Sequence, residues 1–506
     1  MNSISEKKVD LLVTGAGIYG AWMAYDAALR GLSVMIIDKG DIGGGTSSAS
    51  SKLIHGGLRY LEQFNFSLVK KSVKERQNLL KIAPHRVHPL KFGIPVYQSS
   101  RISGWKYKLG LSIYDWFADL KDKTFKHGSL KSEDFIKKFP ILKRDKLKKG
   151  FTYLDAGTDD FRYTLEIVDG AVKAGAELHT YTELINYSEQ EALIRDVFTK
   201  KETRISFKAA INASGQWTDT LFDTKFCRLS KGVHIILPGS TKNALLLLSP
   251  IDQRVFFAIP WYGKTMIGTT DTDFSGDINS VKAEPQDIKY LLDSYNHYLN
   301  EAIKEEQIIS SFAGLRVLKN TEGHPSSVNR DWEWKELQKN IFISLGGKLT
   351  SSREDCSMLI DHVSRSLNCD KKCITDSRMF PWAPEEFDRW KHKTVLKGKK
   401  LKLSETQMEL LISRHGKRAR EILKLIEEDR TLGESIISKL PFTKAELLYI
   451  IQNEYVTTFD DLIRRRIPFT LLRKMTDTDL QNLQELCSLY LNKVNKEDFK
   501  TLSPAL

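Results

Sequence analysis

The N-terminal part of the chain contains two short apolar runs with a glycine-rich turn and a helical segment between them. The first run is Val9–Val13 and the second is Leu32–Ile37, and both have the length of buried strands. Between them, Gly15 to Gly20 interrupts the apolar pattern before a helix begins. The pattern therefore predicts strand, tight turn, helix and strand, which is how a parallel α/β sheet starts.

The spacing of the glycines in this turn suits a dinucleotide. Gly15 permits the tight turn, Gly17 lets the backbone approach a pyrophosphate, and Gly20 lets the helix pack close to the sheet. The phosphates would then meet free N–H groups at a helix N-terminus. Asp38 ends the second strand, where a carboxylate would accept hydrogen bonds from a ribose diol. Glycines in an ordinary surface turn would leave Asp38 without a role. We therefore predict a dinucleotide site, which also includes Ile18, Tyr19 and Lys39.

Later segments predict a second sheet. Residues 208–213 are predicted to form a buried strand that ends just before Gly215. Short alternating segments within 216–340 predict antiparallel strands of a substrate domain. Residues 63–89 predict an amphipathic helix whose basic side chains, including Arg76, are expected to lie in solvent.

Residues 101–120 combine an apolar helical stripe with flanking cations. The stripe consists of Ile102, Trp105, Leu109, Ile113, Trp116, Phe117 and Leu120. Aromatic rings with cationic flanks suit a helix lying in the interface of an anionic bilayer. The alternative is a stripe packed on the protein's own core with its lysines in water.

Composition predicts a globular protein with reduced cysteines and without a membrane-spanning segment. The 506 residues are 41% hydrophobic, which is ample for sizeable cores and predicts a globular protein of several domains. Five scattered cysteines indicate reduced thiols, and Cys369 and Cys373 have no further Cys or His at ligand spacing, so no metal site is expected. The chain has no apolar run long enough to span a membrane and no signal peptide is expected. The net charge of +13 suits an anionic partner, either nucleic acid, an acidic membrane or a phosphorylated substrate.

Residues 43–62 indicate which dinucleotide to expect. Residues 43–52 resemble the segment that wraps FAD in flavin-dependent glycerol-3-phosphate dehydrogenases, and 52–62 resemble that family's signature almost letter for letter. Further family motifs follow in order at 139–140, 159–160, 212–215, 231–234, 268–273, 313–316 and 346–350, and residues 444–466 resemble the family's helical cap. The resemblance implies an α/β fold with an FAD-binding Rossmann-like parallel sheet, an antiparallel-sheet substrate domain and a C-terminal helical domain.

The same resemblance implies domain limits. We expect an FAD-binding domain over 1–385, interleaved with substrate-domain segments near 63–150 and 216–340, then a basic linker over 386–403 and a helical cap over 404–506. Capping boxes at Ser404–Gln407 and Thr443–Glu446 support helices in the cap. The run Arg464–Arg466 is expected to pair with Asp460 and Asp461 upstream rather than to bind nucleic acid.

Roles for individual residues also follow from the resemblance. Cations that would hold a substrate phosphate are Arg59, Arg316, Arg330 and Lys348, with Tyr60 nearby as a hydrogen-bonding group. His234 is the candidate base and His55 its rival, and Lys348 could instead lie over the flavin ring. The further cofactor-binding residues expected are Thr46, Ser47, Ser51, Lys52, His55, Gly57, Gly215, Gly347, Lys348, Leu349 and Thr350.

The activity expected is oxidation of sn-glycerol 3-phosphate to dihydroxyacetone phosphate, with hydride transfer to flavin N5 and electrons passed to membrane quinone. The resemblance implies a monotopic protein on an anionic membrane surface, at the cytoplasmic face of the cell membrane, and is compatible with a homodimer. Three alternatives stay open: a soluble oxidase that reduces oxygen, an FAD amine or amino-acid oxidase, and a nucleic-acid-binding C-terminal module. The sequence leaves open whether the flavin is covalently attached.

Overall fold

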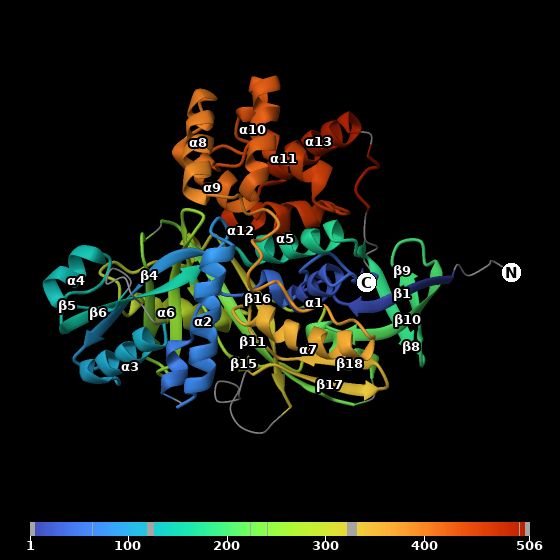
Figure 1. The fold of residues 1–506 in the computed structure, drawn as a ribbon. Coiled ribbons are helices and arrows are strands. Elements are labelled where there is room, and N and C mark those ends of the chain that lie inside the picture. The colour runs from blue at the N-terminus through green and yellow to red at the C-terminus, as the bar shows by residue number, and fades with distance from the viewer. Residues whose placement is uncertain are drawn as a thin grey trace.

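Two sheets form the centre of the protein, and a helical domain covers one end (Figure 1). The computed structural model describes residues 6–62, 64–118, 126–222, 224–239, 241–320, 331–494 and 496–500, without the side chains of Glu6 and Arg59. Among these residues, no helix is long and apolar enough to cross a membrane.

The first sheet is the predicted nucleotide-binding sheet, with parallel pairing at its centre. Its main order is β17 (Glu333–Gln338), β18 (Ile341–Leu345), β10 (Glu202–Asn212), β1 (Glu6–Thr14), β2 (Val34–Ile37) and β7 (Glu177–His179), and β9 (Glu191–Asp196) joins β10 to β8 (Thr182–Tyr187). Strands β1, β2, β7, β10 and β18 pair in parallel. Helices α1 (Ile18–Leu29), α5 (Asp160–Lys173) and α7 (Ser352–Ser366) pack together beside this sheet. Strands β2 and β18 and the C-terminal halves of β1 and β10 are mostly apolar and buried, as expected for parallel strands that are covered on both faces.

The second sheet is almost entirely antiparallel, as predicted for the substrate domain. Its order is β15 (Thr272–Asp273), β11 (Cys227–Leu237), β14 (Lys264–Gly268), β13 (Val255–Trp261), β12 (Ala244–Leu248), β4 (His88–Tyr97), β6 (Leu147–Gly157) and β3 (Leu53–Ile54), with β16 (Ser310–Lys319) on β11 and β5 (Gly128–Lys131) on β6. Helices α4 (Ser132–Lys138) and α6 (Pro285–Asn296) belong to this half. The register of β11 places His234 opposite Phe312 of β16 and Gly268 of β14.

The C-terminal domain begins earlier than its predicted boundary. Residues 386–403, expected to form a linker, contain helix α8 (Phe387–Lys400), because Trp390 is buried in the apolar core of this domain. The other helices are α9 (Glu405–His415), α10 (Ala419–Glu428), α11 (Lys444–Asn453), α12 (Phe469–Leu472) and α13 (Asp477–Lys493). The capping box at Ser404 is present. Thr443 caps α11 as predicted, whereas the Glu446 carboxylate accepts hydrogen bonds from Arg414 and His415.

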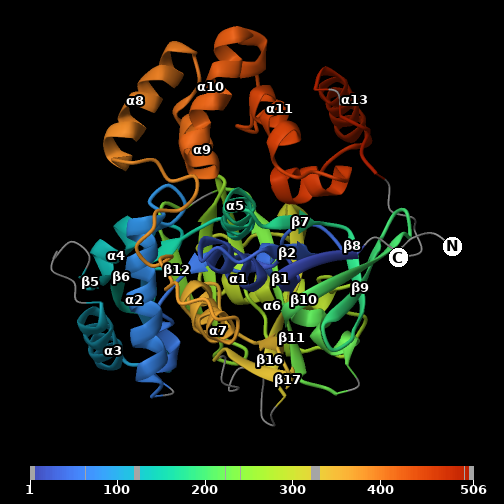
Figure 2. The same cartoon turned by 45° about the vertical axis from the view of Figure 1, so that its right-hand side comes forward.

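Buried ion pairs join this helical domain to the rest of the protein. Figures 1 and 2 show α5 directly beneath the C-terminal helices, and Arg162 of α5 pairs with Glu454 at 2.5 Å with both side chains fully buried. The predicted pairing of Arg465 with Asp461 is confirmed at 2.6 Å. Arg465 also pairs with Asp41 of the nucleotide-binding half, at 2.6 Å. The arginine run therefore holds the two parts of the protein together.

Helices α2 (Phe66–Ile82) and α3 (Gly104–Phe117) lie side by side at the end opposite the C-terminal domain (Figure 1). Three residues of the predicted apolar stripe face solvent, with Trp105 64%, Leu109 55% and Trp116 76% exposed. Ile102 is buried in the core, Ile113 and Phe117 are half-buried, and Leu120 lies outside the described residues. A different face, which includes Tyr107, Leu111 and Tyr114, packs on the core. The alternative of a stripe packed on the protein's own core therefore holds for Ile102 and Phe117 and is wrong for the two tryptophans.

Candidate functional site

The glycine-rich turn after β1 makes the close approaches that a bound pyrophosphate needs. Gly15 has a φ of +103°, and a Cβ atom at this position would lie 2.6 Å from the carbonyl oxygen of Ala213. A Cβ atom at Gly20 would lie 1.8 Å from the carbonyl oxygen of Gly15, so only glycine lets α1 begin so close to the strand. Gly17 is the N-cap of α1 and offers no capping side chain. The helix N-terminus is therefore built for an anion.

Asp38 and Ser47 shape the same turn. Asp38 accepts hydrogen bonds from the N–H groups of Ala16 and Gly40 at 2.7 and 2.9 Å. Burial raises the pKa of Asp38. The Ser47 hydroxyl accepts a hydrogen bond from the Ile18 N–H at 2.9 Å, at the first turn of α1. Asp38 thus orders the turn, and its predicted contact with a ribose stays a prediction.

Lys39 and Lys52, both predicted to bind the cofactor, lie outside the wall of the main cavity. Lys39 is exposed and its ammonium lies 4.6 Å from the ring centroid of Trp217. Lys52 is buried, and its ammonium donates to Asp160 at 2.5 Å and to the Ser48 carbonyl at 3.2 Å. Because a buried charge needs a partner, the Lys52–Asp160 pair fixes the 43–52 segment to α5.

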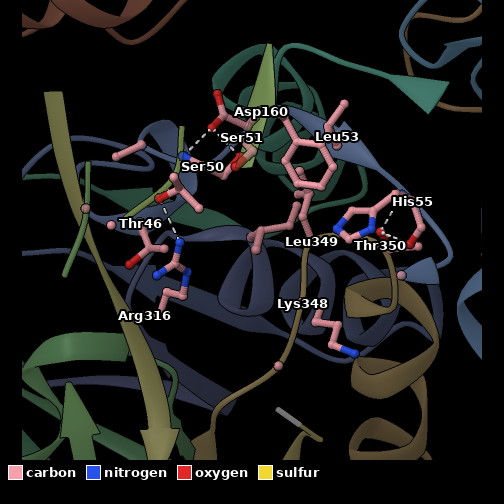
Figure 3. A pocket seen from close by; sticks show the side chains of 18 of the residues that line it. Thr46, Ser50, Ser51, Leu53, His55, Asp160, Arg316, Lys348, Leu349 and Thr350 are labelled. Atoms are coloured by element: carbon pink, nitrogen blue, oxygen red, sulfur yellow. Dashed lines mark hydrogen bonds between the residues drawn. The ribbon is translucent and has the colours of Figure 1, made fainter. Parts of the chain in front are cut away.

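A cavity of about 280 Å³ lies between the two sheets. The predicted residues that line it are Ile18, Tyr19, Thr46, Ser47, Ser51, His55, Gly57, Tyr60, Gly215, His234, Arg316, Gly347, Lys348, Leu349 and Thr350. Figure 3 shows Thr46 and Arg316 on one side of the cavity and His55, Lys348 and Thr350 on the other.

His234 projects from β11 into a closely fitted position in the cavity wall. Its Nε2 atom lies 2.9 Å from the Ser51 hydroxyl, and its ring stacks on Phe312 at 4.9 Å between centroids. A Cβ atom at Gly268 would lie 2.2 Å from the imidazole, so the glycine of the neighbouring strand makes room for it. Burial, helped by the charges of Arg316 and Lys52, holds the pKa of His234 well below its usual 6.5. The imidazole is therefore neutral at pH 7 and can accept a proton.

Arg316 and Lys348 bring positive charge to the cavity. Arg316 donates to Asp271 at 3.0 Å and to the Thr269 hydroxyl at 2.8 Å, and about a fifth of its side chain is exposed. The Lys348 ammonium lies 4.0 Å from the centroid of the Tyr60 ring. The Arg59 side chain and all of Arg330 lie outside the described residues, so their predicted roles stay predictions.

Several lining residues carried no prediction. Thr269 and Gly314 lie within recognised motifs, and Asp160 lies within another, so the motif positions alone could have pointed to them. Tyr153 and Phe257 come from strands of the second sheet, and no local pattern distinguishes them from other core aromatics.

The residues present fit an FAD. The glycine turn admits a pyrophosphate at the start of α1, and Gly215, Gly347 and the 46–57 segment continue from it along one cavity. Apolar side chains such as Leu53, Phe92 and Phe257 supply a surface for an aromatic ring system.

Comparison with known proteins agrees with this fit. Residues 10–348 match the family of FAD-dependent oxidoreductases, and residues 373–497 match the C-terminal domain of alpha-glycerophosphate oxidase. A glycerol-3-phosphate dehydrogenase of Synechocystis sp. is 33% identical over 505 residues, which cover 93% of this chain and 90% of its own length. The aerobic glycerol-3-phosphate dehydrogenase of Escherichia coli is 33% identical over 475 residues, covering 90% and 93%.

A solved structure is similar over nearly the whole chain. The glycerol-3-phosphate dehydrogenase of Bacillus halodurans, complexed with FAD, superposes with a TM-score of 0.77 at 27% identity and covers 98% of this chain and 92% of its own. Two domain matches in the expected order, together with full-length relatives, confirm the resemblance inferred from the motifs. This chain belongs to the FAD-dependent oxidoreductases and, within them, to the glycerol-3-phosphate dehydrogenase family.

Proposed function

We propose that this protein oxidises sn-glycerol 3-phosphate to dihydroxyacetone phosphate and passes the electrons to membrane quinone. The observation that carries the proposal is a buried imidazole, whose pKa lies well below 6.5, together with two cationic side chains in the wall of the same cavity. Bound FAD would supply the acceptor for the hydride that leaves C2 of the substrate. The two relatives named above, which match 93% and 90% of this chain, support the choice of substrate.

The chain's own residues would bind the phosphate and move one proton. Arg316 offers a planar guanidinium to the phosphate dianion, and Lys348 adds a second charge from the opposite side of the cavity. His234 would take the proton from the C2 hydroxyl, directly or through Ser51, as C2 becomes a carbonyl carbon.

The decisive experiment is anaerobic reduction of the purified flavoprotein. Glycerol 3-phosphate should bleach the flavin absorbance, and glycerol, which lacks the phosphate, should not. Bleaching by a secondary amine instead of glycerol 3-phosphate would overturn the proposal in favour of an amine oxidase. Stoichiometric peroxide without an added acceptor would replace quinone by oxygen as the oxidant.

The cation assignment has its own test. Arg316→Met should raise the substrate KM steeply and spare flavin content, because it removes a fork for the phosphate without touching the glycine turn. Arg195, which is paired with Glu183 at 2.8 Å and does not line the cavity, offers a matched control as Arg195→Met. An unchanged KM in Arg316→Met would remove this residue from the phosphate site.

The exposed aromatic surface supports attachment to the cytoplasmic face of an anionic membrane. Trp116 contacts Phe117, which contacts Phe66 at the start of α2, and Trp105 and Leu109 continue the surface along α3. Its rings and aliphatic side chains, next to exposed lysines of the same helix, have the composition of an interfacial helix.

Vesicle binding tests this attachment. Trp105→Ser combined with Trp116→Ser should greatly reduce co-sedimentation with phosphatidylglycerol vesicles. Leu489→Ser is the control, because Leu489 is 62% exposed on α13, at the opposite end of the protein in Figure 1. Equal binding of the double variant and the unaltered protein would contradict the proposed surface.

A further inference from the structure

The inner face of α3 reaches the segment that lines the cavity around residues 55–57. Tyr114 is 1% exposed, and its hydroxyl donates a hydrogen bond to Asp155 at 2.6 Å. The same hydroxyl accepts a hydrogen bond from the Gly56 N–H at 2.8 Å. The helix whose outer face carries the exposed tryptophans therefore contacts the cavity segment through one side chain.

A buried arginine fixes this tyrosine and its acceptor. Arg76 of α2, expected in solvent from the sequence, is 3% exposed and donates to Asp155 at 2.5 Å and to the Leu154 carbonyl at 2.9 Å. Arg76 also donates to the Tyr114 hydroxyl at 3.2 Å. Burial and the neighbouring Asp155 raise the pKa of Tyr114 well above its usual value, so the hydroxyl keeps its proton and remains a donor.

Hydrogen bonds from two successive backbone N–H groups, those of His55 and Gly56, hold the 55–57 segment. The His55 N–H donates to the Thr350 hydroxyl at 3.0 Å, and the Gly56 N–H donates to Tyr114. A Cβ atom at Gly56 would lie 2.4 Å from both the Tyr114 hydroxyl and Val73, so the contact depends on glycine at this position. The side chain of His55 lies in the cavity wall beside this peptide.

We propose that Tyr114, held by Asp155 and Arg76, is a positioning residue that keeps the Gly56 peptide in place and thereby holds His55 and Gly57 in the wall of the cavity that would take the flavin. A buried N–H that loses its partner is costly, and only a longer contact of 3.2 Å to Asp155 would remain for Gly56. Without the hydroxyl, the segment should therefore shift or open. The kinetic part of this inference rests on the proposed function.

The test is Tyr114→Phe in the FAD-loaded enzyme, with Tyr107→Phe as a matched control. Tyr107 lies on the same buried face of α3, and its hydroxyl makes no hydrogen bond with another described residue. In Tyr114→Phe, deuterium uptake in a peptide covering 53–62 should rise and the visible flavin spectrum should shift. Flavin reduction at saturating glycerol 3-phosphate should slow about tenfold, with a smaller change in KM, because the proposed phosphate cations come from other segments.

Unaltered deuterium uptake, spectrum and rate in Tyr114→Phe would overturn the assignment. Equal changes in Tyr107→Phe would also overturn it, because they would show a general loosening of α3. If glycerol 3-phosphate fails to reduce the unaltered enzyme, the proposed function fails. The deuterium uptake and the flavin spectrum would still decide the role of Tyr114.

Discussion

Replacement of His234 by glutamine tests the chemistry of the cavity most directly. The imidazole is 2% exposed, stacks on Phe312 and places Nε2 2.9 Å from Ser51, so it is held in one orientation in the cavity wall. A positioned base typically contributes about 10²–10⁴-fold to a proton-transfer step. His234→Gln should therefore slow anaerobic flavin reduction at least about a hundredfold, which corresponds to about 2.7 kcal/mol in the activation barrier.

The pH dependence of the same reaction gives a second, independent measure. Burial and the nearby positive charges favour neutral His234, so its folded-state pKa lies well below 6.5. The unprotonated base is then the dominant form at pH 7, and activity should fall only when the pH drops well below 6.5. The rate of flavin reduction at saturating glycerol 3-phosphate should therefore have its acid limb well below pH 6.5, whereas kcat/KM also follows the second ionisation of the substrate phosphate at a pH of about 6.

The assay is stopped-flow recording of flavin absorbance after anaerobic mixing with glycerol 3-phosphate. His297→Gln is the control, because His297 is exposed near the end of α6 and does not line the cavity. Normal bleaching in His234→Gln would refute the base assignment and give the role to His55 or to solvent. An acid limb centred near pH 6.5 in the rate of flavin reduction at saturating substrate would refute the argument from burial.

Two further changes test the glycine turn and the joint between domains. Gly20→Ala should yield protein with a low flavin-to-protein ratio, because the new methyl group would lie 1.8 Å from the Gly15 carbonyl oxygen; a normal ratio would contradict the role of this turn. Glu446→Gln should lower the free energy of unfolding at pH 7 by about 3–5 kcal/mol, because it leaves the fully buried Arg414 without its charged partner. Despite burial, Arg414 and the adjoining histidine lower the pKa of Glu446 to about 2, so this stability is present above pH 4.5 and is lost as the pH falls towards 2. Urea unfolding at several pH values measures the loss of stability in Glu446→Gln and the pH dependence of stability in the unaltered protein. Glu133→Gln removes one partner of an exposed ion pair and should lower the free energy of unfolding much less.

Helix α3 illustrates why a correctly predicted helix does not reveal which of its faces packs on the protein. The sequence predicts a helix with an apolar face, and the structure confirms the helix at Gly104–Phe117. Periodicity records which residues share a face, and it does not record what covers that face. Here a second face, with Tyr107, Leu111 and Tyr114, packs on the core and leaves Trp105 and Trp116 in solvent.

The sequence likewise does not reveal which partner a basic side chain finds in the folded protein. Lys52 lies in a cofactor motif, yet its ammonium pairs with Asp160, and Arg76 lies on a predicted solvent face, yet it is buried against Asp155. Both partners are far away in the chain. The sequence around a lysine or arginine does not show whether its charged group will interact with water, with a ligand or with a distant carboxylate.

The sequence by itself determined the features that depend on short-range chemistry. The glycine turn, the strand before it, the helix after it and the capping of α9 at Ser404 follow from local backbone geometry and apolar spacing, which neighbouring residues fix. The tertiary structure alone decided which segments meet. Pairing β11 with β16 places Phe312 against His234, and the fold of the chain brings Asp41 to Arg465 and Tyr114 to Gly56. These contacts join residues separated by long stretches of chain, so they exist only once the two sheets and the helical domain have packed together.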